Sequence, residues 1–152
     1  IGIKVRTTNE NQQAAKDIPA LWEKFMSENC IEKIPNKIDS SILAIYTNYE
    51  GNHTKPYDTI IACKVSNLKD IPEGMVGVEF TNSNYGKFIA KGDLTQGAVY
   101  NAWLNIWEKD LERTYTADFE FYGENAQNPK DAEVEISLSG AKMADEICIK
   151  ST

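Results

Sequence analysis

The sequence has few of the side chains that bind metals or carry redox chemistry. Its 152 residues include one histidine, His53, and three widely spaced cysteines, Cys30, Cys63 and Cys148. Zinc sites and redox-active cysteine pairs need several such side chains at short, regular spacing, and no Cys-x-x-Cys pair is present. We therefore predict no metal and no cofactor, assign the cysteines no chemistry, and expect His53, which lies in a polar turn, to be solvated.

Recognisable catalytic motifs are missing as well. The sequence contains no nucleophile elbow, no phosphate-binding glycine loop and no histidine pair for acid–base catalysis. We predict that the chain is not an enzyme, and we assign no catalytic residue. One exception stays open, because a single buried carboxylate can act as a general base when burial raises its pKa toward neutral pH.

Long hydrophobic runs are also absent. A helix needs about 20 consecutive apolar residues to cross a bilayer, and no run in this sequence approaches that length. No signal-peptide pattern precedes the first predicted strand. We therefore expect no membrane partner and predict a cytoplasmic location.

Positive charge is in deficit. The chain has 16 Lys and Arg against 23 Asp and Glu, a net charge of −7. Affinity for nucleic acid comes chiefly from clustered Lys and Arg that release counterions from phosphates, so we predict no direct nucleic-acid binding by this chain. The acidic excess lies mainly in the second half of the sequence. It favours a cationic ligand, or it serves only to keep the surface soluble.

What the sequence does contain is a repeated order of elements. The motif Trp22-Glu23-Lys24 recurs 85 residues later as Trp107-Glu108-Lys109. Each copy lies on a predicted amphipathic helix with apolar residues at i, i+3, i+4, i+7 and i+8, and the predicted N-caps of these helices are Asp17 and Thr95. Period-two alternation and β-branched runs predict strands over 1–6, 41–47, 59–65, 75–80, 85–90, 118–122 and 132–138. The runs 75–80 and 85–90 are expected to pair as a hairpin.

This order predicts an α+β fold, in which a duplicated βαββ unit packs two main helices on an antiparallel sheet with pseudo-two-fold symmetry. At this length, and with 41% hydrophobic residues, one cooperative domain is expected. We place the domain at residues 1–140, with pseudo-repeats at about 1–66 and 75–140 and a C-terminal tail at 141–152. The seam between the two halves is the predicted place for a central ligand pocket.

A carboxylate is bracketed by aromatic residues in the segment Asp118-Phe119-Glu120-Phe121-Tyr122. Side chains alternate along a strand, so Glu120 and Tyr122 lie on one face and the two phenylalanines on the other. If the Glu120 face lines a cavity, a ligand cation offsets the cost of burying its charge, and each aromatic face adds about 0.5–2 kcal/mol of cation–π attraction. The alternative is that the phenylalanines form core and Glu120 is solvated.

The chain carries three tryptophans and seven tyrosines. The tryptophans lie on the apolar stripes of the predicted helices, where an aromatic residue is most often simply part of the core. Tyrosines can line a pocket and still use their hydroxyl groups to orient a ligand. The candidate ligand-binding residues beside Glu120 are Trp22, Trp103, Trp107, Tyr46, Tyr57 and Tyr122.

A family resemblance rests on four segments taken together: 1–7 (IGIKVRT), 18–25 (IPALWEKF), 71–76 (IPEGMV) and 118–122 (DFEFY). Their order and spacing resemble the effector-binding domain of AraC-type regulators, also called the gyrase-inhibitor-like small-molecule-binding domain. The resemblance implies an aromatic-lined pocket between two βαββ units that accepts amphipathic cations, with Glu120 in the place of a central glutamate. It also implies pocket roles for Tyr46, Tyr57 and Trp107.

The resemblance leaves more than one function open. Similar domains are fused to a DNA-binding helix pair or stand alone, some of them on mobile gene cassettes, and no such helix pair is recognisable in this chain. We predict a stand-alone module that binds cationic or amphipathic drug-like compounds, or the effector domain of a transcription regulator. The alternatives are a hydrolase of strained electrophilic toxins that uses Glu120, and a protein-interaction module similar to gyrase inhibitors. The oligomeric state is left open.

Overall fold

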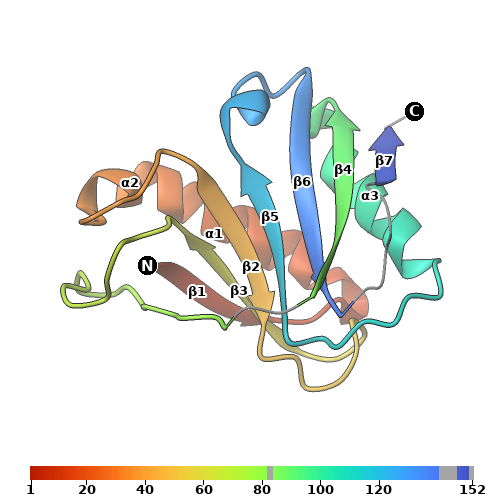
Figure 1. The fold of residues 1–152 in the computed structure, drawn as a ribbon, viewed down its shortest axis with the longest axis horizontal. Helices are drawn as coiled ribbons and strands as arrows, with labels where there is room; N and C mark the ends of the chain where they lie inside the picture. Colours follow the sequence, from red (N-terminus) through yellow and green to blue (C-terminus); the bar gives the residue numbers. More distant parts are fainter. Residues whose placement is uncertain (82–83, 141–146, 151–152) are drawn as a thin grey trace.

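The computed structural model of the chain describes residues 1–81, 84–140 and 147–150. Its strands are β1 (Gly2–Thr7), β2 (Ile42–Thr47), β3 (Tyr57–Ala62), β4 (Tyr85–Gly92), β5 (Ala117–Tyr122), β6 (Ala132–Ser139) and β7 (Ile147–Lys150). Its α-helices are α1 (Ala14–Ser27), α2 (Cys30–Lys33) and α3 (Ala98–Trp107), and its 3-10 helices are η1 (Glu10–Gln12), η2 (Leu94–Gln96) and η3 (Glu124–Ala126). Within these described residues the strands form one seven-stranded sheet in the order β1-β3-β2-β5-β6-β4-β7 (Figure 1).

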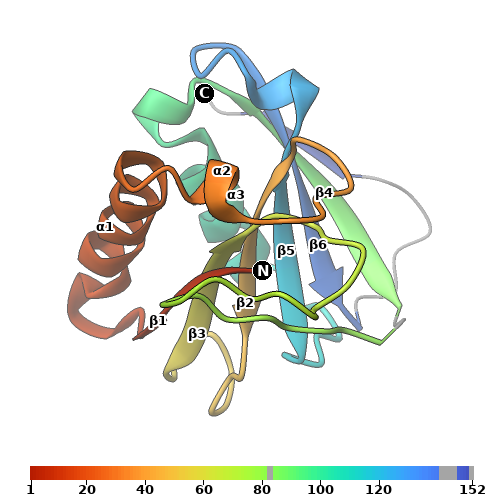
Figure 2. The same cartoon turned by 90° about the vertical axis from the view of Figure 1, so that its left-hand side faces the viewer.

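The two longer helices, α1 and α3, lie on the same face of the sheet (Figure 1, Figure 2). They bury the apolar stripes that the sequence predicts, and Phe25 of α1 and Ile106 of α3 are almost completely buried. Both belong to one core cluster that also contains Phe88 of β4 and Ile136 of β6. One layer of side chains between helices and sheet therefore joins both halves of the chain.

The sheet registers confirm the duplicated βαββ fold, with β1-α1-β2-β3 followed by β4-α3-β5-β6. Strands β2 and β5 pair with each other at the centre, antiparallel. When Tyr46 of β2 is taken as the equivalent of Tyr122 of β5, the paired residues of the neighbouring strands also correspond. Following the registers outward from these two strands, Gly2 of β1 then takes the position of Lys87 of β4. Gly2 and Lys87 are 85 residues apart, the same spacing as the two Trp-Glu-Lys motifs. Strands and helices thus repeat together.

The predicted strand over 75–80 and its hairpin with 85–90 are wrong. Only Val76 of this segment forms a β-bridge, to Gly2, with N–O distances of 3.0 and 2.8 Å. Val76 and Val78 instead pack against a small apolar cluster on the sheet face opposite the helices: Leu43, Ile45, Ile60 and Ala62. The alternation in this segment arises because one side of it covers the sheet, and a coil segment produces that pattern as well as a strand does.

Both predicted helix caps are also wrong. Helix α1 begins at Ala14, so Asp17 lies in its first turn, where its carboxylate accepts a hydrogen bond from the Thr7 hydroxyl at 2.8 Å. Thr95 lies within η2, and its backbone N–H donates to the Asp93 carboxylate at 2.9 Å, so Asp93 is the capping residue. Helix α3 then starts after Gly97, whose φ of 82° suits a glycine.

The end of the chain lies beside β4. Strand β7 pairs parallel to β4, with Ile147 opposite Phe88, and it contains the weak apolar cluster of the predicted tail. Residues 141–146 and 151–152 of that tail lie outside the described residues. No helix in the described part of the chain is long and apolar enough to cross a membrane.

Gly2 is expected to be intolerant of a side chain. A Cβ atom at this position would contact the Ile61 carbonyl oxygen and lie 2.6 Å from Ala62 Cα, both of which are backbone atoms. We expect Gly2→Ala to lower the free energy of unfolding by about 1–3 kcal/mol, the usual range for overpacking. Urea denaturation checks this, with Gly123→Ala as the control because nothing lies within 4 Å of a Cβ there. Equal stabilities of the two variants would contradict the expectation.

Candidate functional site

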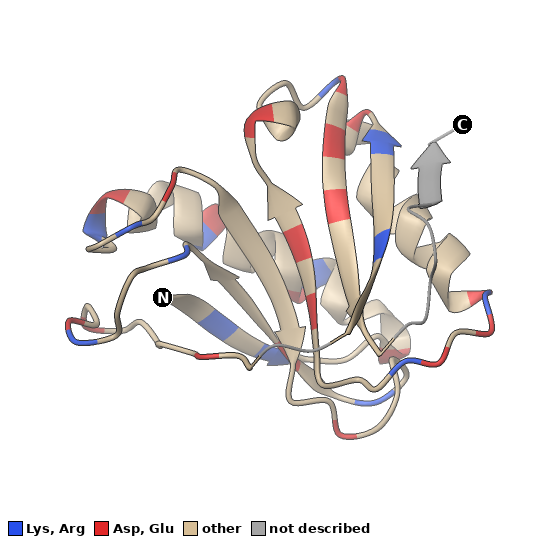
Figure 3. Ribbon diagram, viewed as in Figure 1, with Lys and Arg blue, Asp and Glu red and all other residues tan. Residues whose placement is uncertain are grey.

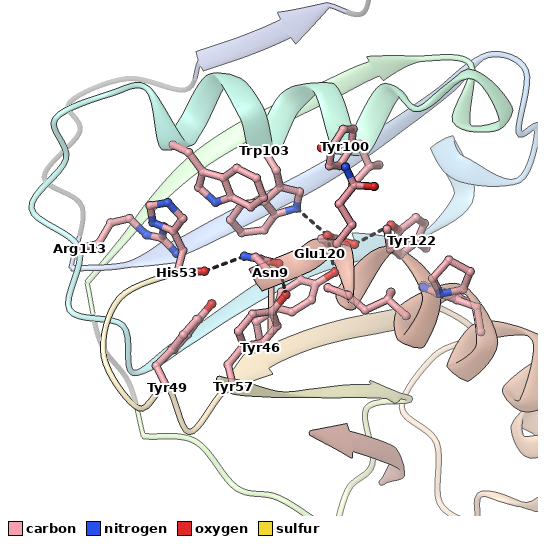
Figure 4. Close-up of a pocket in the computed structure, with 18 residues that line it drawn as sticks. Asn9, Tyr46, Tyr49, His53, Tyr57, Tyr100, Trp103, Arg113, Glu120 and Tyr122 are labelled. Atoms are coloured by element: carbon pink, nitrogen blue, oxygen red, sulfur yellow. Dashed lines mark hydrogen bonds between the residues drawn. The ribbon is translucent and has the colours of Figure 1, made fainter. Parts of the chain in front are cut away.

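A cavity of about 550 Å³ lies between α1, α3 and the central strands (Figure 4). All seven residues selected from the sequence line it: Trp22, Tyr46, Tyr57, Trp103, Trp107, Glu120 and Tyr122. The remaining lining residues are Asn9, Gln12, Ala14, Ala15, Ile18, Pro19, Tyr49, His53, Val99, Tyr100 and Arg113. Both βαββ units thus supply walls of one aromatic cavity.

Glu120 lies at the centre of the sheet with its side chain in the cavity wall. It is 2% exposed and stands opposite Ala44 in the β2–β5 pairing. Because the residue opposite it is small, the longer glutamate side chain has space at the seam between the units. Its neighbour Phe119 points to the other face of the sheet and packs with the second cluster. The alternation predicted for 118–122 is confirmed, and a solvated Glu120 is excluded.

Three neutral donors hold the Glu120 carboxylate. Tyr46 Oη and Trp103 Nε1 donate to Oε2 at 2.8 and 2.7 Å, and Tyr122 Oη donates to Oε1 at 2.6 Å (Figure 4). Among the described residues, no ion pair involves Glu120. Burial raises the pKa of Glu120, although the three hydrogen bonds oppose that shift. When it is ionised, the Glu120 carboxylate therefore has no counter-ion among the described side chains.

The tyrosines around Glu120 remain protonated at neutral pH. Burial and the nearby Glu120 charge raise the pKa of Tyr46 and of Tyr122 well above the ordinary value, and they raise the pKa of Tyr57 to about 12. These hydroxyl groups therefore serve as hydrogen-bond donors and not as bases. The negative charge of this part of the cavity belongs to Glu120.

Edge-to-face contacts fix the aromatic wall. Trp22 meets Tyr122 at a ring-centroid distance of 4.9 Å, and Tyr46 meets Trp103 at 5.5 Å, with interplanar angles of 75° and 81°. Such contacts stabilise a pair by about 0.5–1.5 kcal/mol beyond the area that it buries. The rings are therefore held in place before a ligand binds. Two of them, Tyr46 and Trp103, also donate hydrogen bonds to the Glu120 carboxylate.

His53 is only partly exposed, and it is not simply a solvated turn residue as the sequence predicts. Its ring stacks on Trp107 at 5.2 Å between centroids and 7° between planes, and it lines the cavity. Asn9 holds the loop between β2 and β3 in position through two hydrogen bonds. Its Nδ2 donates to the His53 carbonyl at 2.7 Å, and its Oδ1 accepts from Tyr57 Oη at 2.6 Å. The polar sequence around His53 gave no sign that this loop folds over the cavity.

A buried ion pair was not predicted at all. Arg113 Nη2 lies 2.7 Å from Asp118 Oδ2, and their side chains are 4% and 0% exposed. Asp118 also accepts hydrogen bonds from Tyr49 Oη at 2.6 Å and from the Ser139 backbone N–H at 2.9 Å. Arg113 comes from an irregular segment between α3 and β5, where no periodic pattern marks a residue as buried.

The cavity itself contains little net charge. Acidic and basic residues are interspersed over the molecule (Figure 3), and some pair across strands, as Lys87 does with Glu135 at 3.5 Å. Among the described lining residues, Glu120 and Arg113 are the charged ones, and Arg113 is already paired. Glu120 is thus a more specific argument for a cationic ligand than the overall acidity. No group of three or more His, Cys, Asp and Glu in the described chain is placed to hold a metal ion.

Comparison with known proteins identifies a family and two relatives above 30% identity that match most of the chain. Residues 1–138 match the family described as integron-associated effector binding protein. The chain is 31% identical to YobU of Bacillus subtilis (strain 168), a proposed transcriptional regulator, over 91% of this chain and 89% of that protein. It is 32% identical to an integron cassette protein from the mobile metagenome of Vibrio cholerae, with a TM-score of 0.69 over 91% of this chain and 86% of the other.

A further solved structure shares the fold at lower identity. SAV2435 bound to tetraphenylphosphonium has a TM-score of 0.74 and 21% identity, and the match covers 93% of this chain and 86% of that one. This similarity supports the α+β fold, and the binding of tetraphenylphosphonium is an observation on SAV2435.

Proposed function

Since the chain belongs to the family of integron-associated effector binding proteins, we propose that its cavity binds amphipathic organic cations, with Glu120 as the anionic group. The supporting relatives are a proposed transcriptional regulator at 31% identity and a structural neighbour bound to the cation tetraphenylphosphonium. We infer that residues 1–140 form a single sensing or sequestering domain made of two pseudo-repeats. Its cytoplasmic location stays a prediction.

One observation carries the proposal. Glu120 is buried among aromatic rings, and its oxygens accept hydrogen bonds from uncharged donors. An isolated buried charge is costly unless a partner compensates it. A lipophilic cation supplies that partner, gains cation–π attraction from the surrounding rings and places its apolar groups against the cavity wall. A neutral or anionic compound of the same shape lacks the first two contributions.

The proposal is tested by titrating the protein with tetraphenylphosphonium while recording tryptophan fluorescence. All three tryptophans of the chain line the cavity, so a bound ligand must lie near at least one of them. We expect saturable quenching and an increase in melting temperature, because a ligand that binds only the folded state stabilises it. No change in either signal up to the solubility limit of the compound would contradict the proposal.

Binding of the cation should weaken as the pH falls. The pKa of Glu120 is raised by burial, and only the ionised form compensates a cation, so affinity is lost as the pH drops through the pKa of Glu120 in the free protein. Below that pKa the dissociation constant should rise by up to about tenfold per pH unit. Tetraphenylphosphonium does not titrate, and Glu120→Gln should remove this pH dependence. Since the pKa of Glu120 lies above its ordinary value, a wild-type profile that stays flat from about pH 8 down to about pH 4 would contradict the assignment.

The arrangement favours binding over hydrolysis. A general base must accept a proton from water, and the hydrogen bonds from Tyr46, Trp103 and Tyr122 occupy three of the acceptor positions of Glu120 and stabilise its ionised form. The raised pKa values of the tyrosines leave them as donors. We therefore propose a non-catalytic role. A protein-interaction role would give the carboxylate no part, since Glu120 lies in the wall of a cavity and not on an outer surface that a partner protein would cover.

A further inference from the structure

Two buried polar atoms in the cavity wall have no hydrogen-bond partner. In the described part of the chain, the buried side-chain atoms without a partner are His53 Nδ1, Thr59 Oγ1 and Arg113 Nε. His53 and Arg113 both line the cavity, at the same end of it, whereas Thr59 does not line it (Figure 4). Buried polar groups are nearly always paired, so two unpaired polar atoms at one end of a cavity mark hydrogen-bonding positions that a ligand or an ordered water fills.

The charge of Arg113 is already compensated. Its Nη2 group pairs with Asp118 at 2.7 Å, and its guanidinium lies 4.3 Å from the centroid of the Tyr115 ring. These contacts fix the plane of the guanidinium and leave the Nε–H as an unused donor. Because the Arg113–Asp118 pair is neutral as a whole, this end of the cavity offers a hydrogen bond without a net charge for an anion.

His53 is also uncharged at neutral pH. Burial and the nearby Arg113 lower its pKa, and its ring is held flat against Trp107. A neutral imidazole carries its proton on either nitrogen. With the proton on Nδ1, it becomes a second donor beside Arg113 Nε.

Trp103 links this end of the cavity to Glu120. Its indole Nε1 donates to Glu120 at 2.7 Å, and Arg113 Cζ lies 5.8 Å from the centroid of the same ring. Trp103 therefore contacts both the carboxylate and the guanidinium group of Arg113. A ligand that lies along Trp103 extends from Glu120 toward Arg113.

We infer that Arg113 Nε and His53 Nδ1 form a second subsite, which binds an uncharged acceptor oxygen such as an ester, amide or ketone carbonyl. This inference rests on the proposed function, and it narrows the ligand class from aromatic cations to aromatic cations that carry a carbonyl group a few bonds from the charge. Each new hydrogen bond should add about 0.5–1.5 kcal/mol, or about a two- to tenfold gain in affinity.

Two phosphonium salts of equal chain length test the subsite. (4-Ethoxy-4-oxobutyl)triphenylphosphonium carries an ester, and heptyltriphenylphosphonium carries methylene groups in its place. We expect wild type to bind the ester about fivefold more tightly, although the ester is the less apolar compound. The ratio of the two dissociation constants, measured by fluorescence titration, is the readout because it cancels effects common to both compounds.

Two variants remove the donors separately. His53→Phe keeps an aromatic ring against Trp107 and loses both ring nitrogens. Arg113→Lys keeps a cation for Asp118 and loses Nε. Each should lower the ester preference, and His53→Phe keeps the test valid if Arg113→Lys does not fold. The matched control is Thr59→Val, which removes the third unpaired buried atom outside the cavity and should leave the ratio unchanged.

The outcomes separate this inference from the proposed function. If wild type binds the heptyl compound and shows no preference for the ester, the subsite is wrong and the cation site stands. If neither phosphonium binds, the proposed function fails and the subsite fails with it. The carboxylate analogue with the same spacing, (3-carboxypropyl)triphenylphosphonium, should bind more weakly than the ester because the Arg113 charge is already balanced. Tighter binding of the carboxylate would overturn the inference of an uncharged acceptor.

Discussion

Replacing Glu120 with glutamine is expected to weaken binding of tetraphenylphosphonium by about 10- to 100-fold, because the buried charge that compensates the cation is lost. The shape of the cavity should not change. An amide oxygen in the place of Oε2 accepts from Tyr46 and Trp103, and the amide nitrogen in the place of Oε1 donates to the Tyr122 hydroxyl, which can accept. Calorimetric titration at neutral pH measures the change.

The same substitution should not reduce stability. The pKa of Glu120 is raised in the folded protein, so the folded state binds more protons than the unfolded state. The contribution of Glu120 to the free energy of unfolding is then fully present at a pH below its unfolded pKa, and it is lost as the pH rises through its folded pKa. At a pH above the folded pKa, the ionised Glu120 is therefore a net cost in stability, which glutamine removes.

The control for this variant is Glu124→Gln, an equal charge change at an exposed site. It should alter neither cation affinity nor stability by more than about 0.5 kcal/mol. If Glu120→Gln binds the cation as wild type does, Glu120 is not the compensating group. If the variant unfolds more easily than wild type at neutral pH, the carboxylate stabilises the fold, contrary to this expectation.

Replacing Arg113 with methionine is expected to lower the free energy of unfolding by about 3–5 kcal/mol, since it leaves a buried carboxylate without its cation. Asp118 is completely buried and would keep its hydrogen bonds from Tyr49 and Ser139. Those bonds do not balance its charge, and no other ion pair in the described residues involves Asp118. Urea denaturation measures the loss.

Two further variants show that the effect comes from the unpaired charge. Lys87→Met breaks a strand-to-strand pair in which the lysine is exposed, and it should cost no more than about 1 kcal/mol. Adding Asp118→Asn to Arg113→Met should recover part of the lost stability, because the buried group is then neutral. A loss of stability for Arg113→Met as small as that for Lys87→Met would show that Asp118 does not depend on Arg113 for charge compensation.

Local periodicity accounts for the parts of the fold and the site that the sequence predicts. The strand alternation that places Glu120 and Tyr122 on one face is a property of any strand, and the helix stripes bring the tryptophans to the sheet. Once two βαββ units pair through β2 and β5, these residues meet at the seam. The shared cavity therefore follows from periodicity plus duplication.

The missed features depend on contacts between distant segments. Alternation over 75–80 reflects packing of Val76 and Val78 on the back of the sheet, which periodicity cannot distinguish from strand pairing. His53 and Arg113 come from irregular segments whose sequences carry no burial signal. Their positions are set by tertiary partners, Trp107 for His53 and Asp118 for Arg113. These two residues also define the end of the cavity where the second subsite is proposed.

We propose that this cavity selects organic cations through the buried Glu120 carboxylate. Calorimetric titration of wild type with tetraphenylphosphonium and with tetraphenylborate separates charge from shape, because the two ions match in shape and differ in the sign of their charge. We expect saturable binding of the cation at one site per chain and no measurable binding of the anion. Equal affinities would show that the cavity recognises aromatic shape alone, and preference for the anion would contradict the role of Glu120.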